Sequence, residues 1–339
     1  MYKSIRPLLF RLDPEAAHQL TLTVIRYAGI FPLSRWIVSQ LFRPPLKPVQ
    51  AFGLTFRNPV GLAAGYDKDA VAINGLFALG FGHVEVGTIT PRPQPGNPKP
   101  RIFRLVEDEA VINRMGFPSR GSEYVQKRLS HIRRVGGAIL GINIGKNKET
   151  PNEEAVLDYL VLLQDFAPHA DYLVINISSP NTVGLRQLQG HDALSGLLTQ
   201  LHAQRQLEEQ KLGKRLPLLV KLAPDLAESE LDDAIEVILQ TRMDGVIATN
   251  TTLAREGLRS TRRGETGGLS GSPLAARSEA VLSQIIRRVD GKIPVVSSGG
   301  IMSPDDAKRR LALGASLVQV YTGLVYAGPG LVKQIVSSL

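Results

Sequence analysis

The chain has 339 residues, of which 43% are apolar, and it contains no cysteine. This length suits one large α/β barrel or two ordinary domains, and the lack of cysteine excludes disulfides, thiolate metal sites and cysteine nucleophiles. The formal net charge is +9, and the first 48 residues hold seven basic residues against two acidic ones. Such an excess suits nucleic acid, an anionic membrane or an anionic ligand. The six histidines form no helical His-x-x-x-His pair, so we expect no metal site.

Residues 1–48 are expected to form a helical cap with a stiff linker at 43–48, distinct from a second domain at 49–339. Asp13-Pro14-Glu15 is typical of a helix start, and apolar residues recur at helical spacing on both sides of it. The cap is either a subdomain packed on the body or an amphipathic element lying on an anionic bilayer. No stretch approaches the ~18 apolar residues of a spanning helix, and no secretory signal opens the chain. We therefore expect neither a membrane span nor export.

From residue 58 onward, short β-branched runs alternate with longer helical patterns. The predicted strands are Val60–Ala63, His83–Gly87, Ala138–Ile144, Tyr172–Ile177, Pro217–Leu222, Gly245–Thr249, Pro294–Ser298 and Leu317–Tyr321. Helices are predicted near 67–79, 119–134, 152–167, 192–211, 228–241, 274–289, 304–313 and 329–338. Eight such units predict a (β/α)8 TIM barrel, of class α/β, with an inserted β-hairpin at 101–113. A doubly wound sheet is the alternative, but Gly61–Tyr66 lacks its Gly-x-Gly-x-x-Gly turn.

Polar residues follow every predicted strand, at the end of a barrel where active sites lie. They include Lys68, Thr88, Asn143, Asn176, Ser179, Asn181, Lys221, Thr249, Asn250, Thr251, Ser298, Tyr321 and Thr322. Glycines at 267–271, 299–300 and 323 have the composition of a phosphate cradle, because they let backbone N–H groups converge on an anion. Ordinary tight turns are the alternative reading of these glycines. The whole set predicts one site at the carboxyl ends of the strands.

Several separated segments resemble dihydroorotate dehydrogenases, in matching order along nearly the whole chain. They are residues 64–69, 113–117, 141–146, 176–186, 249–252, 267–271 and 298–301. The segment 13–18, Asp-Pro-Glu-Ala-Ala-His, resembles the quinone-dependent, membrane-associated class 2 of that family. The resemblance implies an FMN enzyme that oxidises dihydroorotate to orotate in pyrimidine biosynthesis and passes the electrons to a quinone. It also implies a serine base, at Ser179, because only class 1 uses cysteine.

The resemblance implies three groups of binding residues. Those for the substrate are Lys68, Asn113, Arg114, Met115, Gly116, Phe117, Asn176, Asn181, Asn250 and Thr251. Those for FMN are Ala64, Gly65, Tyr66, Asp67, Lys68, Thr88, Asn143, Asn176, Lys221, Thr249, Gly271, Gly300, Tyr321 and Thr322. His18, Arg104 and Tyr321 are candidates for the quinone head group. Pro118 departs from the family, which often has Asn there.

Two other functions stay open at this point. A tRNA dihydrouridine synthase is another FMN barrel, but it uses a cysteine and a basic RNA-binding extension, and this chain has neither. A membrane-binding module with a decayed barrel would carry no flavin. We expect a monomer that contacts a membrane peripherally and binds no nucleic acid. The first residues enter the helical cap almost at once, without a presequence rich in Ser and Arg, which favours the cytoplasmic face of a bacterial inner membrane.

Overall fold

The computed structural model describes residues 2–134 and 137–339, and its centre is a closed barrel of eight parallel strands. The strands are β3 (Val60–Leu62), β4 (His83–Ile89), β7 (Ile139–Ile144), β8 (Tyr172–Asn176), β9 (Leu218–Leu222), β10 (Gly245–Ala248), β12 (Val295–Ser298) and β13 (Leu317–Val320). Their spatial order follows the chain, and β13 pairs with β3 to close the ring. All eight predicted strands are present, so the TIM-barrel prediction is confirmed and the open-sheet alternative is excluded.

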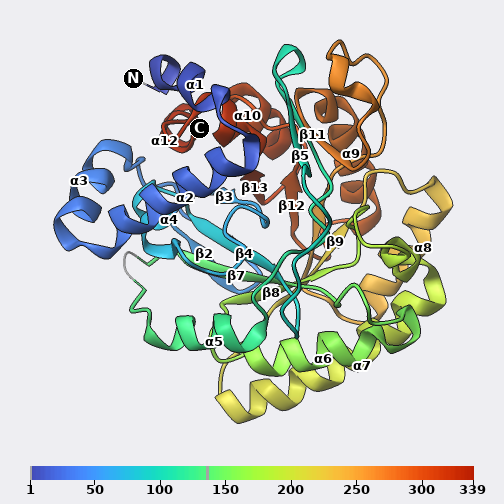
Figure 1. Cartoon of the computed structure of the whole chain (residues 1–339). Helices are drawn as coiled ribbons and strands as arrows, with labels where there is room; N and C mark the ends of the chain where they lie inside the picture. Colours follow the sequence, from blue (N-terminus) through green and yellow to red (C-terminus); the bar gives the residue numbers. More distant parts are fainter. Residues whose placement is uncertain (1, 135–136) are drawn as a thin grey trace.

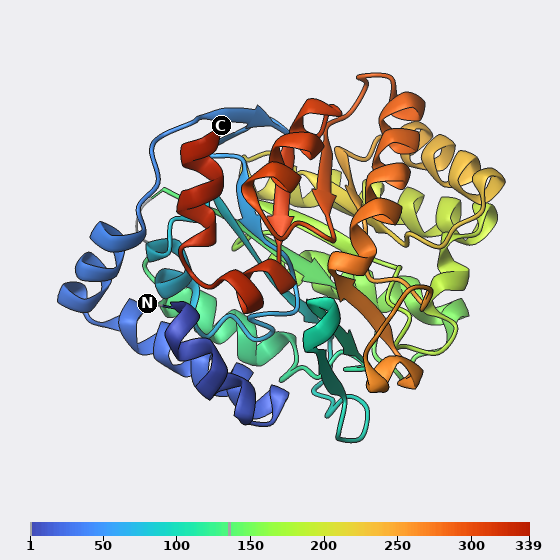
Figure 2. The same ribbon diagram turned by 90° about the horizontal axis from the view of Figure 1, so that it is seen from above.

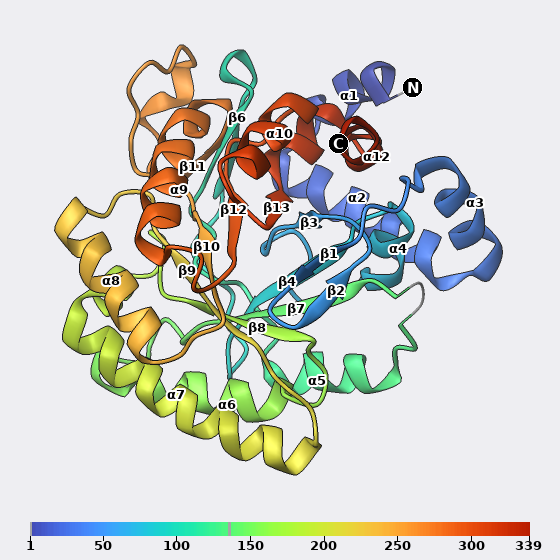
Figure 3. The same ribbon diagram turned by 180° about the vertical axis from the view of Figure 1, so that it is seen from behind.

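Helices surround the barrel on its outer side (Figures 1 and 3). They are α4 (Ile73–Ala78), α5 (Ser122–His131), α6 (Ala155–Phe166), α7 (His191–Leu212), α8 (Glu228–Gln240), α9 (Ala275–Val289), α10 (Pro304–Ala312) and α12 (Leu331–Ser338). The first of these begins later than predicted, because the Asp67 carboxylate accepts hydrogen bonds from the N–H groups of Val71 and Ala72. A further short helix, α11 (Thr322–Ala327), directly follows β13 and was not predicted.

A small hairpin closes the amino-terminal end of the barrel. Its strands, β1 (Val49–Ala51) and β2 (Leu54–Phe56), pair in antiparallel fashion just before the first barrel strand. Phe52 and Phe56 pack edge to face, and Phe56 also contacts the ring of His83. The sequence analysis did not predict this hairpin, whose strands have three residues each. The opposite end of the barrel is thus the open one.

Beside that open end lies a three-stranded antiparallel sheet. The predicted hairpin is present as β5 (Ile102–Leu105) and β6 (Ala110–Asn113), and a third strand, β11 (Gly268–Gly271), pairs with β6. In this register Gly268 lies opposite Asn113. The third strand is made of residues that the sequence analysis interpreted only as a phosphate-binding loop. It therefore links that loop to the hairpin.

The cap consists of α1 (Tyr2–Arg11), α2 (Pro14–Ile30) and α3 (Pro32–Phe42), at one side of the barrel beside the C-terminal helices (Figure 2). Asp13 caps α2 by accepting from the N–H groups of Glu15 and Ala16, as its sequence predicts. Where α2 crosses α4, a Cβ on Gly75 would lie 1.9 Å from the carbonyl oxygen of Ile25, so only glycine permits this approach. In the described part of the chain, no helix has both the length and the apolar character needed to cross a membrane.

Candidate active site

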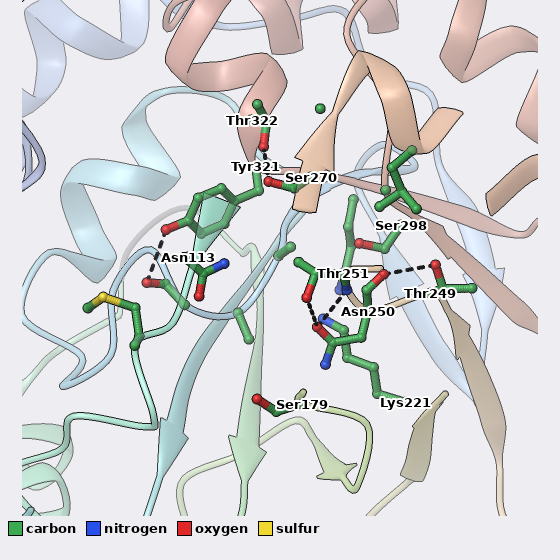
Figure 4. A pocket seen from close by; sticks show the side chains of 18 of the residues that line it. Asn113, Ser179, Lys221, Thr249, Asn250, Thr251, Ser270, Ser298, Tyr321 and Thr322 are labelled. Carbon is green, nitrogen blue, oxygen red and sulfur yellow. Dashed lines mark hydrogen bonds between the residues drawn. The ribbon is translucent and has the colours of Figure 1, made fainter. Parts of the chain in front are cut away.

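A polar cavity lies at the carboxyl ends of the barrel strands, and it gathers most of the predicted site residues (Figure 4). The predicted residues that line it are Ala64, Gly65, Lys68, Thr88, Asn113, Met115, Gly116, Phe117, Asn176, Ser179, Asn181, Lys221, Thr249, Asn250, Thr251, Gly271, Gly300, Tyr321 and Thr322. They come from the carboxyl ends of the barrel strands and the loops that follow them, except at β7, and from the antiparallel sheet. Convergence from such distant segments is what the (β/α)8 fold provides.

Side-chain amides and a hydroxyl form two hydrogen-bonded groups at the cavity, one around Asn176 and one that pairs Asn181 with Asn113. The Nδ2 of Asn176 donates to the Thr88 hydroxyl at 2.8 Å and to Asn143 Oδ1 at 3.0 Å. The Nδ2 of Asn250 donates to Asn176 Oδ1 at 3.3 Å, and Asn181 Nδ2 donates to Asn113 Oδ1 at 3.2 Å. Each of these amide groups can both donate and accept hydrogen bonds. They could therefore pair with the edge of a ligand that itself carries amide groups. The arrangement suits a flat ligand with alternating carbonyl and N–H groups.

The two serines after β8 have different surroundings. Ser178 is fully buried, and its hydroxyl donates to Asn176 Oδ1 and accepts from Asn250 Nδ2 at 3.0 Å. Ser179 lines the cavity, and its Oγ accepts the backbone N–H of Asn181 at 3.3 Å. The first serine therefore supports the wall, while the second presents an oxygen to a ligand with one N–H already directed at it.

A carboxylate and a lysine lie beneath the cavity. Glu85 is fully buried and accepts from Asn143 Nδ2 at 2.8 Å and from Gln319 Nε2 at 2.6 Å. Its carboxylate is 4.0 Å from the Nζ of Lys221. Sequence analysis missed Glu85 and Gln319, because both occupy ordinary interior positions within strands rather than strand ends. This buried carboxylate therefore fixes Asn143 through a hydrogen bond and attracts the Lys221 ammonium through its negative charge.

Lys68 is enclosed, and its ammonium donates to the backbone oxygen of Gly65 at 2.6 Å. Burial lowers the pKa of Lys68 to about 8, while the nearby Asp69 carboxylate acts in the opposite direction. Its ammonium is thus a partly desolvated cation at the cavity wall. Such a group attracts an anionic ligand more strongly than an exposed lysine does.

The glycines form a concave surface at the other end of the cavity. The φ of Gly300 is +72°, and a Cβ there would lie 2.6 Å from the backbone nitrogen of Ala275, the first residue of α9. The nearby Thr322 hydroxyl donates to the Ser270 hydroxyl at 2.8 Å. Backbone N–H groups, hydroxyls and the amino end of a 15-residue helix therefore converge, as at sites that bind phosphate.

Some predicted residues lie behind the cavity wall rather than on it. Asp67 is fully buried with its carboxylate on backbone N–H groups, and burial raises its pKa to about 6. Asn143 supports Thr88 and Asn176, and the Arg114 side chain turns outward to pair with Glu265 at 2.7 Å. Ser298, Gly299 and Gly323 also line the cavity, as expected from their places after the strands. Lining residues to which the sequence analysis gave no role are Ala63, Ser270, Leu274, Ile301, Met302 and Gln319. Ser270 and Ile301 belong to glycine-rich segments that the sequence analysis had already identified, so membership of those segments could have indicated them.

A second cavity, apolar and of about 460 Å³, lies between the cap and the barrel. It brings together the three candidate quinone contacts, His18, Arg104 and Tyr321, and the ring of Tyr66. Burial and the charge of Lys68 lower the pKa of His18 to about 3, so its imidazole is neutral near pH 7. Arg104 donates to the carbonyl oxygens of Leu9 and Leu12 and so fastens the hairpin to the cap.

The two cavities share part of their walls. Asn113, Met115 and Tyr321 line both of them. The Tyr321 hydroxyl donates to the Gly65 oxygen at 3.5 Å, and burial raises its pKa. A molecule in the polar cavity and a molecule in the apolar cavity would therefore be separated by a few side chains only.

These residues fit a flavin mononucleotide. Such a ligand needs a phosphate site, hydrogen-bond partners for a flat polar ring, and a cation near the ring edge that becomes negative on reduction. The glycine surface around Gly300, the Thr88 hydroxyl with the Asn176 amide, and the ammonium of Lys221 supply these three features. The fold and site together define a (β/α)8-barrel enzyme with a place for a phosphate-bearing cofactor.

Comparisons with known proteins agree with that class. The family model described as "Dihydroorotate dehydrogenase" matches residues 47–339. The chain is 50% identical to "Dihydroorotate dehydrogenase (quinone)" of Idiomarina loihiensis over all of both chains, and 48% identical to the protein of that name from Azotobacter vinelandii, covering 100% of this chain and 96% of the other. A ligand-free dihydroorotate dehydrogenase from Eimeria tenella superimposes with a TM-score of 0.86 at 44% identity, covering 96% of this chain and 94% of that one. This chain belongs to the dihydroorotate dehydrogenase family.

Proposed function

We propose that this protein oxidises dihydroorotate to orotate in pyrimidine biosynthesis, with FMN as its bound flavin and a quinone as the electron acceptor. The observation that carries the proposal is the contact between two unlike cavities, one polar and one apolar, across Asn113, Met115 and Tyr321. The polar cavity suits an anionic diamide, and the apolar cavity suits a lipophilic acceptor. The quinone-type relatives at about half identity over the whole chain support the same activity.

Ser179 is the proposed base, which takes a proton from C5 of dihydroorotate. A neutral hydroxyl can take this proton only if it passes its own proton on, and the Asn181 N–H that Oγ accepts would stabilise the negative charge left on the oxygen by that loss. Ser179 is nearly buried, so water is excluded from the transfer. The Thr182 hydroxyl is buried and has no hydrogen-bond partner among the described residues, which makes it our candidate to pass the proton on.

The remaining polar groups would orient the substrate. Lys68 supplies the cation for the carboxylate, and the amides of Asn113, Asn176, Asn181 and Asn250, with the Thr251 hydroxyl, match the ring edges. The backbone of residues 114–117 closes one side. Because the asparagines already bond to one another, they are held in place before the substrate arrives.

When bound, a flavin would supply an acceptor for the hydride that leaves C6 and a donor of the same two electrons to the quinone. The residues that would hold its ring are Ala64, Gly65, Thr88, Asn176, Lys221 and Thr249, with Asn143 supporting Thr88 and Asn176 from behind the wall. Those that would hold its phosphate are Gly271, Gly300, Tyr321 and Thr322. Lys221 would stabilise negative charge on the ring, with Glu85 fixing the position of its ammonium. Tyr66 and Asp67 would act from behind the wall, by shaping the loop that carries Gly65 and Lys68.

The apolar cavity is the proposed route for the quinone. His18, Arg104 and Tyr321 would lie near the head group of the quinone. We propose that residues 1–48 form a domain that rests on the bilayer, while residues 49–339 form the catalytic barrel. Large apolar side chains on all three cap helices are exposed, including Leu8, Val24 and Leu33. The protein would act as a monomer, bound peripherally at the cytoplasmic face of a bacterial inner membrane.

The test is the visible absorption spectrum of the purified protein. We expect a flavin spectrum that is bleached by dihydroorotate under anaerobic conditions and restored by a quinone. Extraction of the flavin should release FMN in a ratio of one per chain. A colourless protein, or a flavin that dihydroorotate does not bleach, would contradict the proposal.

A further inference from the structure

A third cavity, of about 480 Å³, opens on the outer side of the cap between α3 and α4. It shares no lining residue with the polar or the apolar cavity. Three arginines line it from separate places in the chain: Arg35 within α3, Arg43 at its end, and Arg57 just after β2. The sequence analysis noted the positive charge of residues 1–48, but the catalytic site uses none of these three arginines.

The lining of this cavity carries positive charge only, because none of its lining residues is acidic. In the part of the chain that the structure describes, no carboxylate forms an ion pair with Arg35 or Arg43. Burial and the neighbouring charge of Arg43 both lower the pKa of Arg57. Like charges thus converge in one hollow, an arrangement that an anion would stabilise.

The cavity lies next to the most exposed apolar part of the cap. Trp36 lines the cavity and is 60% exposed, while Leu33 and Leu41 of the same helix are 69% and 60% exposed. Tryptophan and arginine side by side with bare aliphatic side chains are typical of the headgroup level of a membrane surface. The arginines are thus placed where the phosphates of a bilayer would lie if this helix rested on it.

Helix α3 also separates this cavity from the apolar one. Val38 and Phe42 line the apolar cavity, whereas Trp36 and Ser39 line the basic one. A ligand in the basic cavity would therefore bind to α3, the same helix that lines the proposed quinone route, and would hold it against the bilayer. This link connects lipid binding to the orientation of the apolar cavity.

We propose that the cavity lined by Arg35, Arg43 and Arg57 binds the phosphodiester headgroup of an anionic phospholipid. The inference rests on the membrane contact proposed above and adds the lipid chemistry. Guanidinium groups bind phosphate oxygens through paired hydrogen bonds, which a single ammonium cannot do. Arg35 donates through Nη1 to the Gly29 oxygen at 3.1 Å, which orients the guanidinium and leaves its other N–H groups for a ligand.

The test is flotation with two kinds of vesicle, one of phosphatidylcholine alone and one with about a fifth of phosphatidylglycerol. The variant Arg35→Gln/Arg43→Gln removes two cations from the cavity, and Arg11→Gln/Arg26→Gln removes two exposed cations elsewhere on the cap. A general surface attraction weakens by about fivefold per charge lost, equally in both pairs. We expect the cavity pair to bind the anionic vesicles at least about tenfold more weakly than the control pair, because it also loses the paired phosphate bonds.

Equal losses in the two pairs would overturn the site while leaving the membrane proposal intact. Failure of the wild type to bind either vesicle would refute the membrane contact itself. Millimolar inorganic phosphate should not displace the wild type from anionic vesicles; if it does, the site takes free phosphate and the lipid assignment is wrong. Flavin reduction by dihydroorotate should be unchanged in both double variants, which checks that they are folded. If Arg35→Gln unfolds the cap, the single variants Arg43→Gln and Arg11→Gln provide the same comparison.

Discussion

The polar cavity and the apolar cavity touch the same tyrosine, Tyr321, yet they are built by different means. The polar cavity is held by barrel strands whose side chains are already hydrogen-bonded to one another, as Asn176 and Asn250 are. The apolar cavity is walled largely by helices, which contribute few polar groups. The polar cavity is suited to orienting a rigid polar substrate, and the apolar cavity is suited to admitting a hydrophobic one. Changes confined to one cavity should therefore affect one half of the reaction.

The largest effect is expected for Ser179→Ala. Loss of a positioned base should slow flavin reduction by dihydroorotate by about 10²–10⁴-fold. Binding of FMN and of orotate should remain, because the amide network does not include the Ser179 side chain as a donor. Single-turnover absorbance measures the rate, and Ser178→Ala is not a control here, since that hydroxyl supports the wall. A near-normal reduction rate would refute the assignment.

The next effect tests the apolar cavity. Ala17 lines it, whereas the adjacent Ala16 is exposed and does not. Ala17→Trp should fill the route and slow reoxidation by a quinone by about tenfold or more, because a whole indole occupies space that the acceptor needs. Ala16→Trp should reoxidise like the wild type. Equal behaviour of the two variants would place the quinone route elsewhere.

A smaller effect depends on pH. Because the pKa of Lys68 is lowered to about 8, its ammonium is present below pH 8 and is lost as the pH rises through that value. The dissociation constant of orotate should therefore increase above pH 8, by at most about tenfold per pH unit. Lys68→Met should bind orotate weakly and without this rise. An affinity that stays constant from pH 7 to 10 in the wild type would show that Lys68 does not contact the ligand.

The smallest effect concerns His18. With a pKa of about 3, His18 is neutral over the whole range from pH 5 to 8, so the quinone step should show no inflection from it. His18→Gln should slow that step only by about fivefold, the value of one hydrogen bond. A pH inflection near 6.5 that disappears in the variant would mean that the histidine becomes charged during the reaction.

The sequence predicted the barrel and most of its polar cavity, because each strand is a short apolar run whose end is marked by a polar residue or a glycine. Asn176 and Lys221 could be placed in this way. Glu85 could not, since nothing in a single strand shows which interior residue meets a partner from β7 or β13. The third strand at Gly268–Gly271 was also missed, because its pairing with β6 bridges more than 150 residues of chain.

The residues behind the wall illustrate the same limit. Asp67 lies within a motif that resembles a binding loop, but its carboxylate is used by the backbone of Val71 and Ala72. Motif membership therefore indicates the neighbourhood of a ligand, not the direction of each side chain. The basic cavity beside α3 is a further case, because its arginines are separated by up to 22 positions in sequence and only the fold brings them together.

The central claim is that two separate cavities serve one flavin, and anaerobic stopped-flow absorbance of the two half-reactions tests it most directly. Ser179→Ala should slow reduction by dihydroorotate and leave reoxidation by quinone unchanged after chemical reduction. Ala17→Trp should show the opposite pattern. If either variant slowed both half-reactions to the same extent while remaining folded, the separation of the two cavities would be contradicted.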